Sequence, residues 1–477
     1  MAERRGIDYR RRRNTILRII LERTLGLPLI PKEFFGSHWS QEELLTALYL
    51  ENVHLRKNTI DNTPLVALKP PSVAQVSDEP EYQIVREFLK HHSRRTGANR
   101  HLVLTNDYPD YGKEYGNGFV HRRIRAYMDA GLTIDVMLFN KRAARRVYEF
   151  DRVRVLSGGA HELNGLLAAQ AYNSISAHFF NREMWNTLYH HRRSCLTPLH
   201  VYVHGYDARH WMRRRHDIQS HGDLRNAIER SNSLREFWTE LATSIYRPDS
   251  FIFVSQYWRE LMQQDMDIDI PHGHGRVIHN FIDGDLFKYQ KKEPQQRFRI
   301  LWARSATSRH YGADIGVDVL RKLLDSRHGP RVEATVVGDG QYFDLFEAAF
   351  KDDPRVSISR GFVTQDRVAD LHKSHGFFLV PTRLDTQGVS RDEAMSSGLV
   401  PITNAVAAVP EFVDNECGVV APSEDASSMA ERTLKLMDDP DQFSAKSLAA
   451  SLRVRSQSGR TFTIDREIAM MEGASVE

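Results

Sequence analysis

The residue types best suited to chemistry cluster in one segment, residues 381–398, which leads from a strand end into a helix. Asp385 lies in the loop, Glu393 follows eight positions later inside the helix, and Gly388 lies between them. The first turn of a helix offers unpaired N–H groups and the positive end of the helix dipole, and a glycine lets the backbone approach a ligand closely. The segment therefore predicts a diphosphate site in which the two acids bind hydroxyl groups.

The order of residues in this segment resembles glycosyltransferase family 4, which typically carries Glu-Gly-Phe-Gly, Glu-Ala-Met and Gly-x-Pro-Val in succession. Glu393-Ala-Met395, Gly398 and Pro401 match that order, and a Pro-Glu pair follows. Asp385 stands where the first Glu is expected, which shortens the reach by one methylene. The resemblance covers most of residues 100–450. It implies a retaining, metal-independent glycosyltransferase that moves a hexosyl unit from a nucleotide-diphosphate sugar.

Two cations are expected beside the diphosphate. In the family, an Arg and a Lys five or six residues later hold the donor phosphates. Arg304 matches the first, and Arg309 is the best candidate for the second. Such cations stabilise the negative charge that builds on the leaving nucleotide. An ordinary structural salt bridge is the alternative for Arg309. The segment 277–283 with Phe287 resembles the family's crossing between its two domains.

The remaining site residues follow from the same resemblance. Gly338 belongs to a Val-Gly-Asp-Gly turn after a strand, and Phe362 lies near the expected nucleobase. In the first half, a Gly-rich loop at 110–118 is expected near donor and acceptor, and His204 is expected to face the reacting sugar. The complete predicted set is Asp385, Glu393, His204, Arg304 and Arg309 for catalysis; Gly338, Gly388, Val389, Ser390 and Phe362 for donor binding; and Gly116, Asn117 and Gly118 for an acceptor-side loop.

The implied mechanism is departure of the diphosphate from the front face, with the acceptor hydroxyl attacking on the same side. Arg304 and Arg309 would stabilise the leaving group together with the helix N-terminus near Ser390. Glu393 would anchor the ribose, and Asp385 would orient the hexose. No metal and no cofactor are expected, since the nucleotide sugar is a substrate. The acceptor is expected to be a glycan or a lipid-linked molecule in cell-envelope polysaccharide synthesis.

Two other functions are compatible with these residues. A nucleotide-sugar epimerase or a sugar phosphorylase can share the fold, and would interconvert nucleotide sugars or require phosphate without a separate acceptor. A non-catalytic scaffold for a glycan or a partner would bind without turnover. The acidic run at 265–269 predicts a solvated loop, because as an EF-hand loop it has Ile270 instead of Gly and Arg276 instead of Glu.

Short apolar strands that alternate with helices are expected to position these residues. Strands are predicted at 101–105, 133–139, 153–156, 199–203, 251–254, 299–303, 334–337, 357–360, 376–380 and 400–403. Helices are predicted at 82–92, 119–130, 163–171, 233–244, 316–324, 366–373 and 391–397. This alternation predicts parallel sheets covered on both faces. With the resemblance it gives the expected α/β architecture, GT-B, in which two Rossmann-like doubly wound domains face a ligand-binding cleft.

The expected domain plan has four parts. They are a helical, basic extension at 1–95, an acceptor-side Rossmann-like domain at 96–285, a nucleotide-sugar-binding Rossmann-like domain at 286–455, and a C-terminal segment at 456–477 that crosses back to the first domain. A proline-rich, loop-like stretch at 62–80 and a polar linker at 283–297 suggest these boundaries.

Composition restricts the class and the location of the protein. The 477 residues carry 65 Lys and Arg against 62 Asp and Glu, a net charge of +3 that does not favour nucleic acid as a partner. The two cysteines, Cys195 and Cys417, predict neither a disulfide framework nor a zinc site, and fit the cytoplasm. Residues 1–30 contain eight Arg. They predict either peripheral contact with the inner face of a membrane or a helix packed on its own domain.

Overall fold

The computed structural model describes residues 70–90, 99–112 and 116–474, so the predicted basic helix and most of the predicted 1–95 extension lie outside the described residues. The chain divides into two compact units, of which one includes Ile218–Ser233. The helix α8 (His221–Thr243) has its residues 221–233 in that unit. Before the helix, Ser220 Oγ accepts a hydrogen bond from the Asp223 backbone N–H at 3.1 Å. Every described strand and the whole candidate site belong to the other unit.

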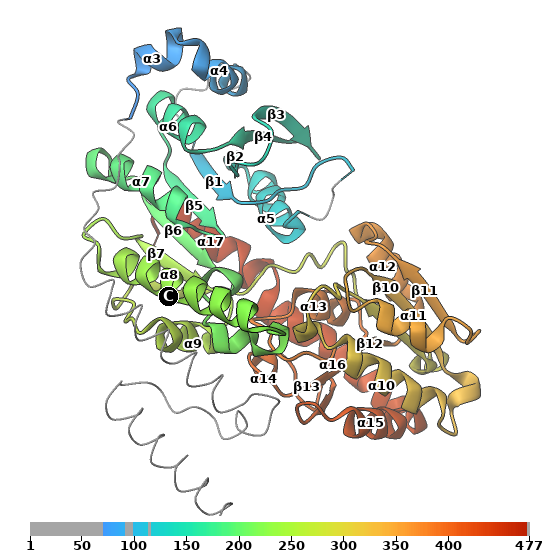
Figure 1. The fold of residues 1–477 in the computed structure, drawn as a ribbon. Coiled ribbons are helices and arrows are strands. Elements are labelled where there is room, and N and C mark those ends of the chain that lie inside the picture. Colours follow the sequence, from blue (N-terminus) through green and yellow to red (C-terminus); the bar gives the residue numbers. More distant parts are fainter. Residues whose placement is uncertain (1–69, 91–98, 113–115, 475–477) are drawn as a thin grey trace, which may run out of the picture. The chain divides into compact units, whose positions relative to one another are not determined.

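The first sheet has eight strands in the order β3-β4-β2-β1-β5-β6-β7-β8 (Figure 1). They are β1 (Arg100–Thr105), β2 (Thr133–Phe139), β3 (Arg146–Phe150), β4 (Val153–Gly158), β5 (Ser174–His178), β6 (Leu199–Val203), β7 (Ser250–Phe253) and β8 (Gly275–Val277). All pairs are parallel except β3 with β4. The expected wholly parallel sheet is wrong at this edge, because the short turn between β3 and β4 leaves no room for a crossover.

The second sheet has six strands, all parallel, in the order β11-β10-β9-β12-β13-β14. They are β9 (Arg299–Ala303), β10 (Glu333–Gly338), β11 (Val356–Arg360), β12 (Phe377–Leu379), β13 (Val400–Asn404) and β14 (Val419–Ala421). The strand order reverses between β9 and β12, and in the first sheet it reverses between β1 and β5. This is the doubly wound plan, so the expected pair of α/β domains is confirmed.

Every strand predicted from the sequence is present, with ends within two residues of the prediction. Four further strands, β3, β5, β8 and β14, have no counterpart in the predicted pattern. β5 reads Ser-Ile-Ser-Ala-His, yet all of its residues are buried between β1 and β6. Its burial comes from its neighbours in the sheet, which a local apolar pattern does not reveal.

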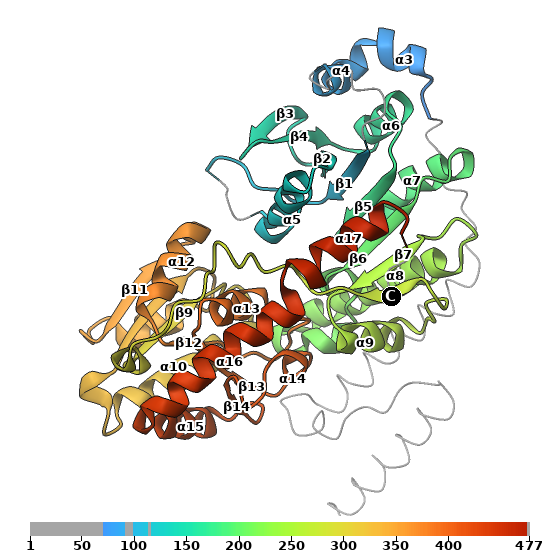
Figure 2. The same ribbon diagram turned by 180° about the vertical axis from the view of Figure 1, so that it is seen from behind.

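Helices cover both faces of each sheet (Figure 1, Figure 2). They are α3 (Val73–Asp78), α4 (Gln83–Leu89), α5 (Gly118–Asp129), α6 (Ala160–Ala169), α7 (Arg182–Ser194), α9 (Gln256–Met266), α10 (Ala313–Leu324), α11 (Asp344–Phe350), α12 (Gln365–Ser374), α13 (Val389–Ser396), α14 (Val409–Phe412), α15 (Ala426–Asp438), α16 (Pro440–Ser458) and α17 (Ile464–Met471). Side chains alternate along β1: Leu102 and Leu104 pack with α6 and α7, and Val103 packs with α5. Among the described residues, no helix is long and apolar enough to cross a membrane.

A helix interrupts the proline-rich stretch that is predicted to be a loop. α3 begins after Ser72, whose Oγ accepts a hydrogen bond from the Gln75 backbone N–H at 3.2 Å. The Gln75 side chain in turn accepts from the Ser72 backbone N–H at 2.9 Å. This reciprocal cap starts the helix, and Val76 then packs into the core of the first sheet. The loop prediction at 62–80 is therefore wrong at 73–78, because the prolines lie outside the capped turn.

The last helix lies on a face of the first sheet (Figure 2), where Met470 packs with Tyr202 and Ile252. From this helix, α17, the Glu467 carboxylate accepts hydrogen bonds from Arg123 Nε at 3.0 and 3.2 Å. Both side chains are fully buried. This ion pair fixes α17 against α5, which carries residues of the candidate site.

Glu467→Ala is expected to lower the free energy of unfolding by about 3–5 kcal/mol, because it leaves the buried guanidinium of Arg123 without a counter-ion. Asp465→Ala is the control. Its ion pair with Arg460 is long, at 3.6 Å, and half exposed, and such pairs contribute about 0–1 kcal/mol. Urea denaturation measures both variants. Equal destabilisation of the two would contradict this account of α17.

Candidate active site

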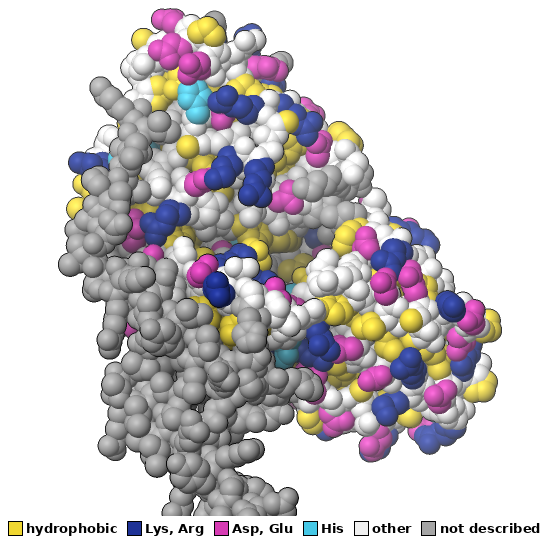
Figure 3. Space-filling model, viewed as in Figure 1, with side chains coloured by type: hydrophobic (Ala, Val, Ile, Leu, Met, Phe, Trp, Pro, Cys, Tyr) yellow, Lys and Arg dark blue, Asp and Glu magenta, His cyan; other side chains and the backbone are white. Residues whose placement is uncertain are grey.

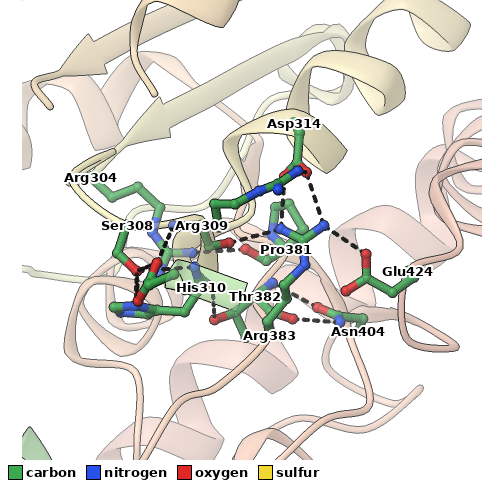
Figure 4. Close-up of polar contacts among 11 residues, drawn as sticks. Arg304, Ser308, Arg309, His310, Asp314, Pro381, Thr382, Arg383, Asn404 and Glu424 are labelled. Carbon is green, nitrogen blue, oxygen red and sulfur yellow. Dashed lines mark hydrogen bonds and ion pairs between the residues drawn. The ribbon is translucent and has the colours of Figure 1, made fainter. Parts of the chain in front are cut away.

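The candidate site lies where the second sheet reverses its strand order, at the carboxyl ends of β9 and β12. Parallel strands end at the same edge, and the reversal leaves a crevice between the loops that follow the two central strands. Arg304 follows β9, and its Nη1 donates a hydrogen bond to the carbonyl oxygen of Pro381, after β12, at 3.1 Å (Figure 4). A second contact runs from Thr382 Oγ1 to the carbonyl oxygen of His310 at 2.9 Å. The two loops are thus held side by side.

A cavity of about 180 Å³ opens at this crevice. Its walls come from the ends of β9 and β10, the loops after β9 and β11, the strand β12, and the helices α12 and α13. The structure brings five of the predicted residues together around it: Arg304, Gly338, Phe362, Ser390 and Glu393. Gln365 and His372 line it as well, although no motif singles them out. The predicted residues Asp385, Gly388, Val389 and Arg309 are not part of its lining.

Glu393 is buried and paired with a residue of the first sheet domain. Its carboxylate accepts a hydrogen bond from Nη2 of Arg122, on α5, at 2.7 Å. Burial raises the pKa of Glu393 to about 7, and the charge of Arg122 opposes this rise. The other guanidinium nitrogens of Arg122, Nε and Nη1, are buried without a hydrogen-bond partner among the described residues. The sequence-based prediction does not include Arg122. The one signal for it in the sequence is its position one helical turn after the Gly-rich loop.

The loop before α13 has a shape that depends on glycine. Gly388 has φ of +106°, and a Cβ there would lie 2.7 Å from Nη1 of Arg391. The buried Arg391 guanidinium donates to the carbonyl oxygen of Gln387 and to the Asp392 carboxylate. Asp385 Oδ1 accepts a hydrogen bond from the Gln387 backbone N–H at 3.2 Å. Asp385 therefore helps to shape this loop and remains partly exposed beside the crevice.

Arg309 points away from the cavity. Its guanidinium lies 3.6 Å from the Asp314 carboxylate, and half of its side chain is exposed. Arg383 binds the same carboxylate through two hydrogen bonds of 2.8 and 2.9 Å (Figure 4). The ring of Tyr311 lies beside Arg304 instead, with its centroid 5.0 Å from the guanidinium carbon. The loop after β9 thus brings one Arg to the cavity, and Arg309 forms the salt bridge left open as its alternative.

His204 lies at the end of β6 and is 9% exposed. Its Nε2 lies 2.9 Å from Nδ1 of His178, and its ring packs on Phe179 at 4.7 Å between centroids. Burial lowers the pKa of His204 well below its usual value, so the ring is neutral. Its Nδ1 is buried without a hydrogen-bond partner in the described part of the chain. Thr386 Oγ1 donates to the His204 carbonyl oxygen at 2.8 Å, which sets this histidine beside the loop of Asp385.

The Gly-rich loop mainly positions α5. The Asn117 side chain donates to three oxygens of residues 105–107 at 3.0–3.2 Å and so closes the loop on the end of β1. At Gly116 a Cβ would lie 2.8 Å from the carbonyl oxygen of Tyr108, so the backbone is tightly packed there. Gly118 begins α5, one turn before Arg122. The loop thereby sets the position from which Arg122 reaches Glu393.

A larger cavity, of about 860 Å³, has Arg122, Ser396 and Gln365 in its lining. Gln365 lines the smaller cavity too. Five basic and five acidic side chains line the larger one, so its charges are balanced. On the face shown in Figure 3, basic and acidic side chains are likewise interspersed over the helices of the second sheet. Inside the site, Arg122 is paired with Glu393, and Arg304 donates to the carbonyl oxygen of Pro381.

Residues 297–439, which include all six strands of the second sheet, match the family model described as "Glycosyl transferases group 1". The second sheet domain is a group 1 glycosyltransferase domain. The predicted enzyme class is therefore confirmed at the level of this domain. Every predicted donor-side residue lies within the matched range, and His204 and the Gly-rich loop lie before it.

One curated relative is the sulfoquinovosyl transferase SQD2 of Arabidopsis thaliana, 25% identical over 105 residues. The match covers 22% of this chain and 20% of the relative, so it spans about a fifth of the relative's length. It places a sulfoquinovosyl transferase among the proteins similar to this chain.

Solved structures resemble a much larger part of the chain. Sucrose-phosphate synthase from Thermosynechococcus elongatus has a TM-score of 0.56 at 15% identity, over 78% of this chain and 98% of its own. Anabaena Alr3699/HepE in complex with UDP and glucose has a TM-score of 0.56 at 16% identity, over 78% and 99%. A glycosyltransferase from Rickettsia africae has a TM-score of 0.58 at 13% identity, over 79% and 98%. These similarities confirm the GT-B fold, of which the group 1 domain is one part.

Glu393→Gln is expected to change how stability depends on pH. Burial raises the pKa of Glu393 from the ordinary 4.5 to about 7. Between these values the folded protein keeps a proton that the unfolded chain has released. The stability that this group contributes is therefore complete below about pH 4.5 and is lost as the pH rises through about 7. Glutamine has no such proton, so the stability of the variant relative to wild type rises by up to about 3 kcal/mol over this window.

Urea denaturation from about pH 5 to about pH 8 measures this difference. Glu416→Gln is the matched control, since the Glu416 side chain is 84% exposed and its removal should leave a curve parallel to wild type. A constant difference between Glu393→Gln and wild type across the range would show that the carboxyl does not titrate as described.

Proposed function

We propose that the protein is a retaining, metal-independent hexosyltransferase that moves a hexosyl unit from a nucleoside-diphosphate sugar to a glycan or lipid-linked acceptor. The cavity of about 180 Å³ at the switch point of the second sheet carries this proposal. Residues predicted for the donor from separate motifs, among them Arg304, Gly338 and Ser390, line this one cavity. A donor of this class needs a cation and N–H groups for its diphosphate and a carboxylate for its ribose, and all are present.

The nucleotide end of the donor is assigned to the group 1 domain. Arg304 supplies the cation: its Nε is buried without a hydrogen-bond partner among the described residues, and a phosphate oxygen would satisfy it. Ser390 and the first turn of α13 supply N–H groups and the positive end of a helix dipole. Glu393 binds the ribose hydroxyls, and Phe362, half exposed at the rim, lies near the base.

The sugar end of the donor is assigned to the loop between β12 and α13. Asp385 and the backbone after Gly388 orient the hexose. His204 approaches from the first sheet, and because its ring is neutral it can donate or accept a hydrogen bond through Nδ1 without adding charge.

The proposed step breaks the bond between the anomeric carbon and the diphosphate oxygen, and the electron pair stays on the diphosphate. The acceptor hydroxyl oxygen forms its bond on the same face, and its proton passes to a phosphate oxygen. Arg304 and the N-terminus of α13 stabilise the growing negative charge, so the step needs no cofactor and no metal. The protein would act at the cytoplasmic side in cell-envelope polysaccharide synthesis, in keeping with the family resemblance.

The comparisons support the donor class. The similar Anabaena protein forms a complex with UDP and glucose, and the Arabidopsis relative is named as a transferase of a sugar, sulfoquinovose. UDP and glucose are the two parts of a nucleoside-diphosphate sugar, the donor class proposed for this cavity, and the Arabidopsis name adds a second sugar transferase.

The first experiment is a thermal unfolding assay with UDP, GDP, dTDP, ADP and CMP. A ligand at 100 times its Kd stabilises the folded protein by about 2.7 kcal/mol, which raises the melting temperature by roughly 5–10 °C for domains of this size. We expect one nucleoside diphosphate to produce this rise in wild type and a much smaller rise in Arg304→Gln.

Arg327→Gln is the matched control. This exposed Arg of the same domain pairs with Asp438 and takes no part in the cavity, so the nucleotide response should equal that of wild type. If no nucleotide raises the melting temperature of wild type, or if Arg304→Gln responds as wild type does, the donor-site assignment fails. Once the donor is known, NMR of the product tests retention: an inverted anomeric configuration would refute the front-face step.

A further inference from the structure

A segment of the first sheet domain, residues 204–217, is anchored at both ends on the group 1 domain. At its start, Gly205 packs against the Thr386 side chain: a Cβ at Gly205 would lie 2.6 Å from the Thr386 methyl carbon. Thr386 Oγ1 also donates to the His204 carbonyl oxygen at 2.8 Å. This anchor lies beside Asp385, at the proposed sugar end of the site.

At the other end of the segment, Asp217 binds the loop that follows β9. Its carboxylate accepts hydrogen bonds from Ser308 Oγ at 2.6 and 2.7 Å and from the Arg309 backbone N–H at 3.0 Å. These bonds join the short helix η4 (Trp211–Asp217) to the short helix η6 (Arg309–Tyr311). Both anchors thus hold the segment over the two loops that meet at Arg304.

Arg209 lies between these anchors in the sequence, and hydrogen bonds hold the turn that precedes it. The Asp207 carboxylate accepts the Gly205 backbone N–H at 2.9 Å, and the Asp207 carbonyl oxygen accepts from Trp238 Nε1 at 2.8 Å. Arg209 follows this turn in an extended conformation and is partly buried. Its Nε is fully buried without a hydrogen-bond partner among the described residues.

Arg209 and Arg304 both act on the same two residues of the loop after β9, His310 and Tyr311. Burial lowers the pKa of His310 to about 3, and the neighbouring guanidinium groups of Arg209, Arg304 and Arg214 lower it further in that order. Burial raises the pKa of Tyr311, and the charges of Arg304, Asp385, Arg209 and Asp217 also act on it. Arg209 and Arg304 therefore flank His310 and Tyr311 together, each with an unsatisfied buried Nε. A phosphate oxygen bound between the two side chains would satisfy both Nε atoms.

We propose that Arg209 is the second cation for the donor diphosphate, supplied by the first sheet domain and acting with Arg304. This inference rests on the proposed function and adds to it a catalytic residue that no sequence motif singles out. It accounts for the position of Arg309, which is turned toward Asp314. When the bond to the anomeric carbon breaks, Arg209 would bind the diphosphate oxygens that take up the electron pair, and the acceptor proton passes to one of them.

The test is the preference for a nucleoside diphosphate over the matching monophosphate, measured as a ratio of Kd values by calorimetry. UDP with UMP, GDP with GMP and ADP with AMP are the probes. In Arg209→Gln we expect the diphosphate to bind about 10-fold to 100-fold more weakly, the range for loss of a hydrogen bond to a charged group. The monophosphate should bind within a few-fold of wild type, because it lacks the second phosphate. Arg209→Lys should keep part of the preference.

Arg213→Gln is the matched control. Arg213 lies in the same segment and is also partly buried, but its guanidinium is bound by Asp265 at 2.8–3.3 Å. Its loss should alter stability and leave the diphosphate preference unchanged.

The outcomes separate this inference from the proposed function. If wild type binds no nucleotide, the proposed function fails and this inference fails with it. If wild type prefers the diphosphate and both Arg209→Gln and Arg209→Lys keep the full preference, the proposed function stands and Arg209 has no part in the site. A fall that affects monophosphate and diphosphate equally would also overturn the inference, since it would mark a purely structural role.

Discussion

Burial of charge where the two sheet domains meet sets the requirements for the rest of the site. Removing an ion from water costs several kcal/mol, and a guanidinium has five N–H groups to satisfy. Arg122 pairs with Glu393, and Arg304 donates a hydrogen bond to the carbonyl oxygen of Pro381. Both keep buried nitrogens without a partner among the described residues. In the proposed function, an anionic, hydroxyl-rich ligand would supply the acceptors for these nitrogens.

The same constraint explains why residues from both domains meet at one place. The group 1 domain carries Arg304 and Glu393 at the edge where its parallel strands end. The first sheet faces it with α5 and with the segment that begins at His204. Glu393 shows the consequence: burial raises its pKa to about 7, and among the described residues its ion-pair partner is Arg122, which belongs to the other sheet domain. The protonation state of Glu393 thus depends on contact between the domains.

Most of the fold follows from the sequence, and so do five of the residues that line the small cavity, because both depend on local sequence patterns. The predicted strands are short apolar runs, and Arg304, Gly338, Ser390 and Glu393 each lie in an ordered motif at the end of a strand or the start of a helix.

The sequence-based prediction fails where a residue's position depends on a contact that is distant in the sequence. Arg309 has the charge and the spacing expected of a phosphate-binding residue. Its side chain instead pairs with Asp314, and the Tyr311 ring lies beside Arg304. Arg122 and Arg209 carry no motif, since their positions depend on α5 and on the anchors at Thr386 and Ser308. β5 was missed for the same reason, as its polar residues are buried by neighbouring strands.

A second cation from the first sheet domain behaves differently from one in the loop after β9. A cation in that loop would stabilise the leaving diphosphate whether or not the domains were in contact. Arg209 reaches the diphosphate only while Asp217 binds Ser308 and Thr386 binds the His204 carbonyl oxygen. Full charge stabilisation then exists only in the arrangement that also buries the sugar and excludes water. Such coupling suppresses loss of the donor to water, because an arrangement open to water lacks one of the two cations that the leaving group needs.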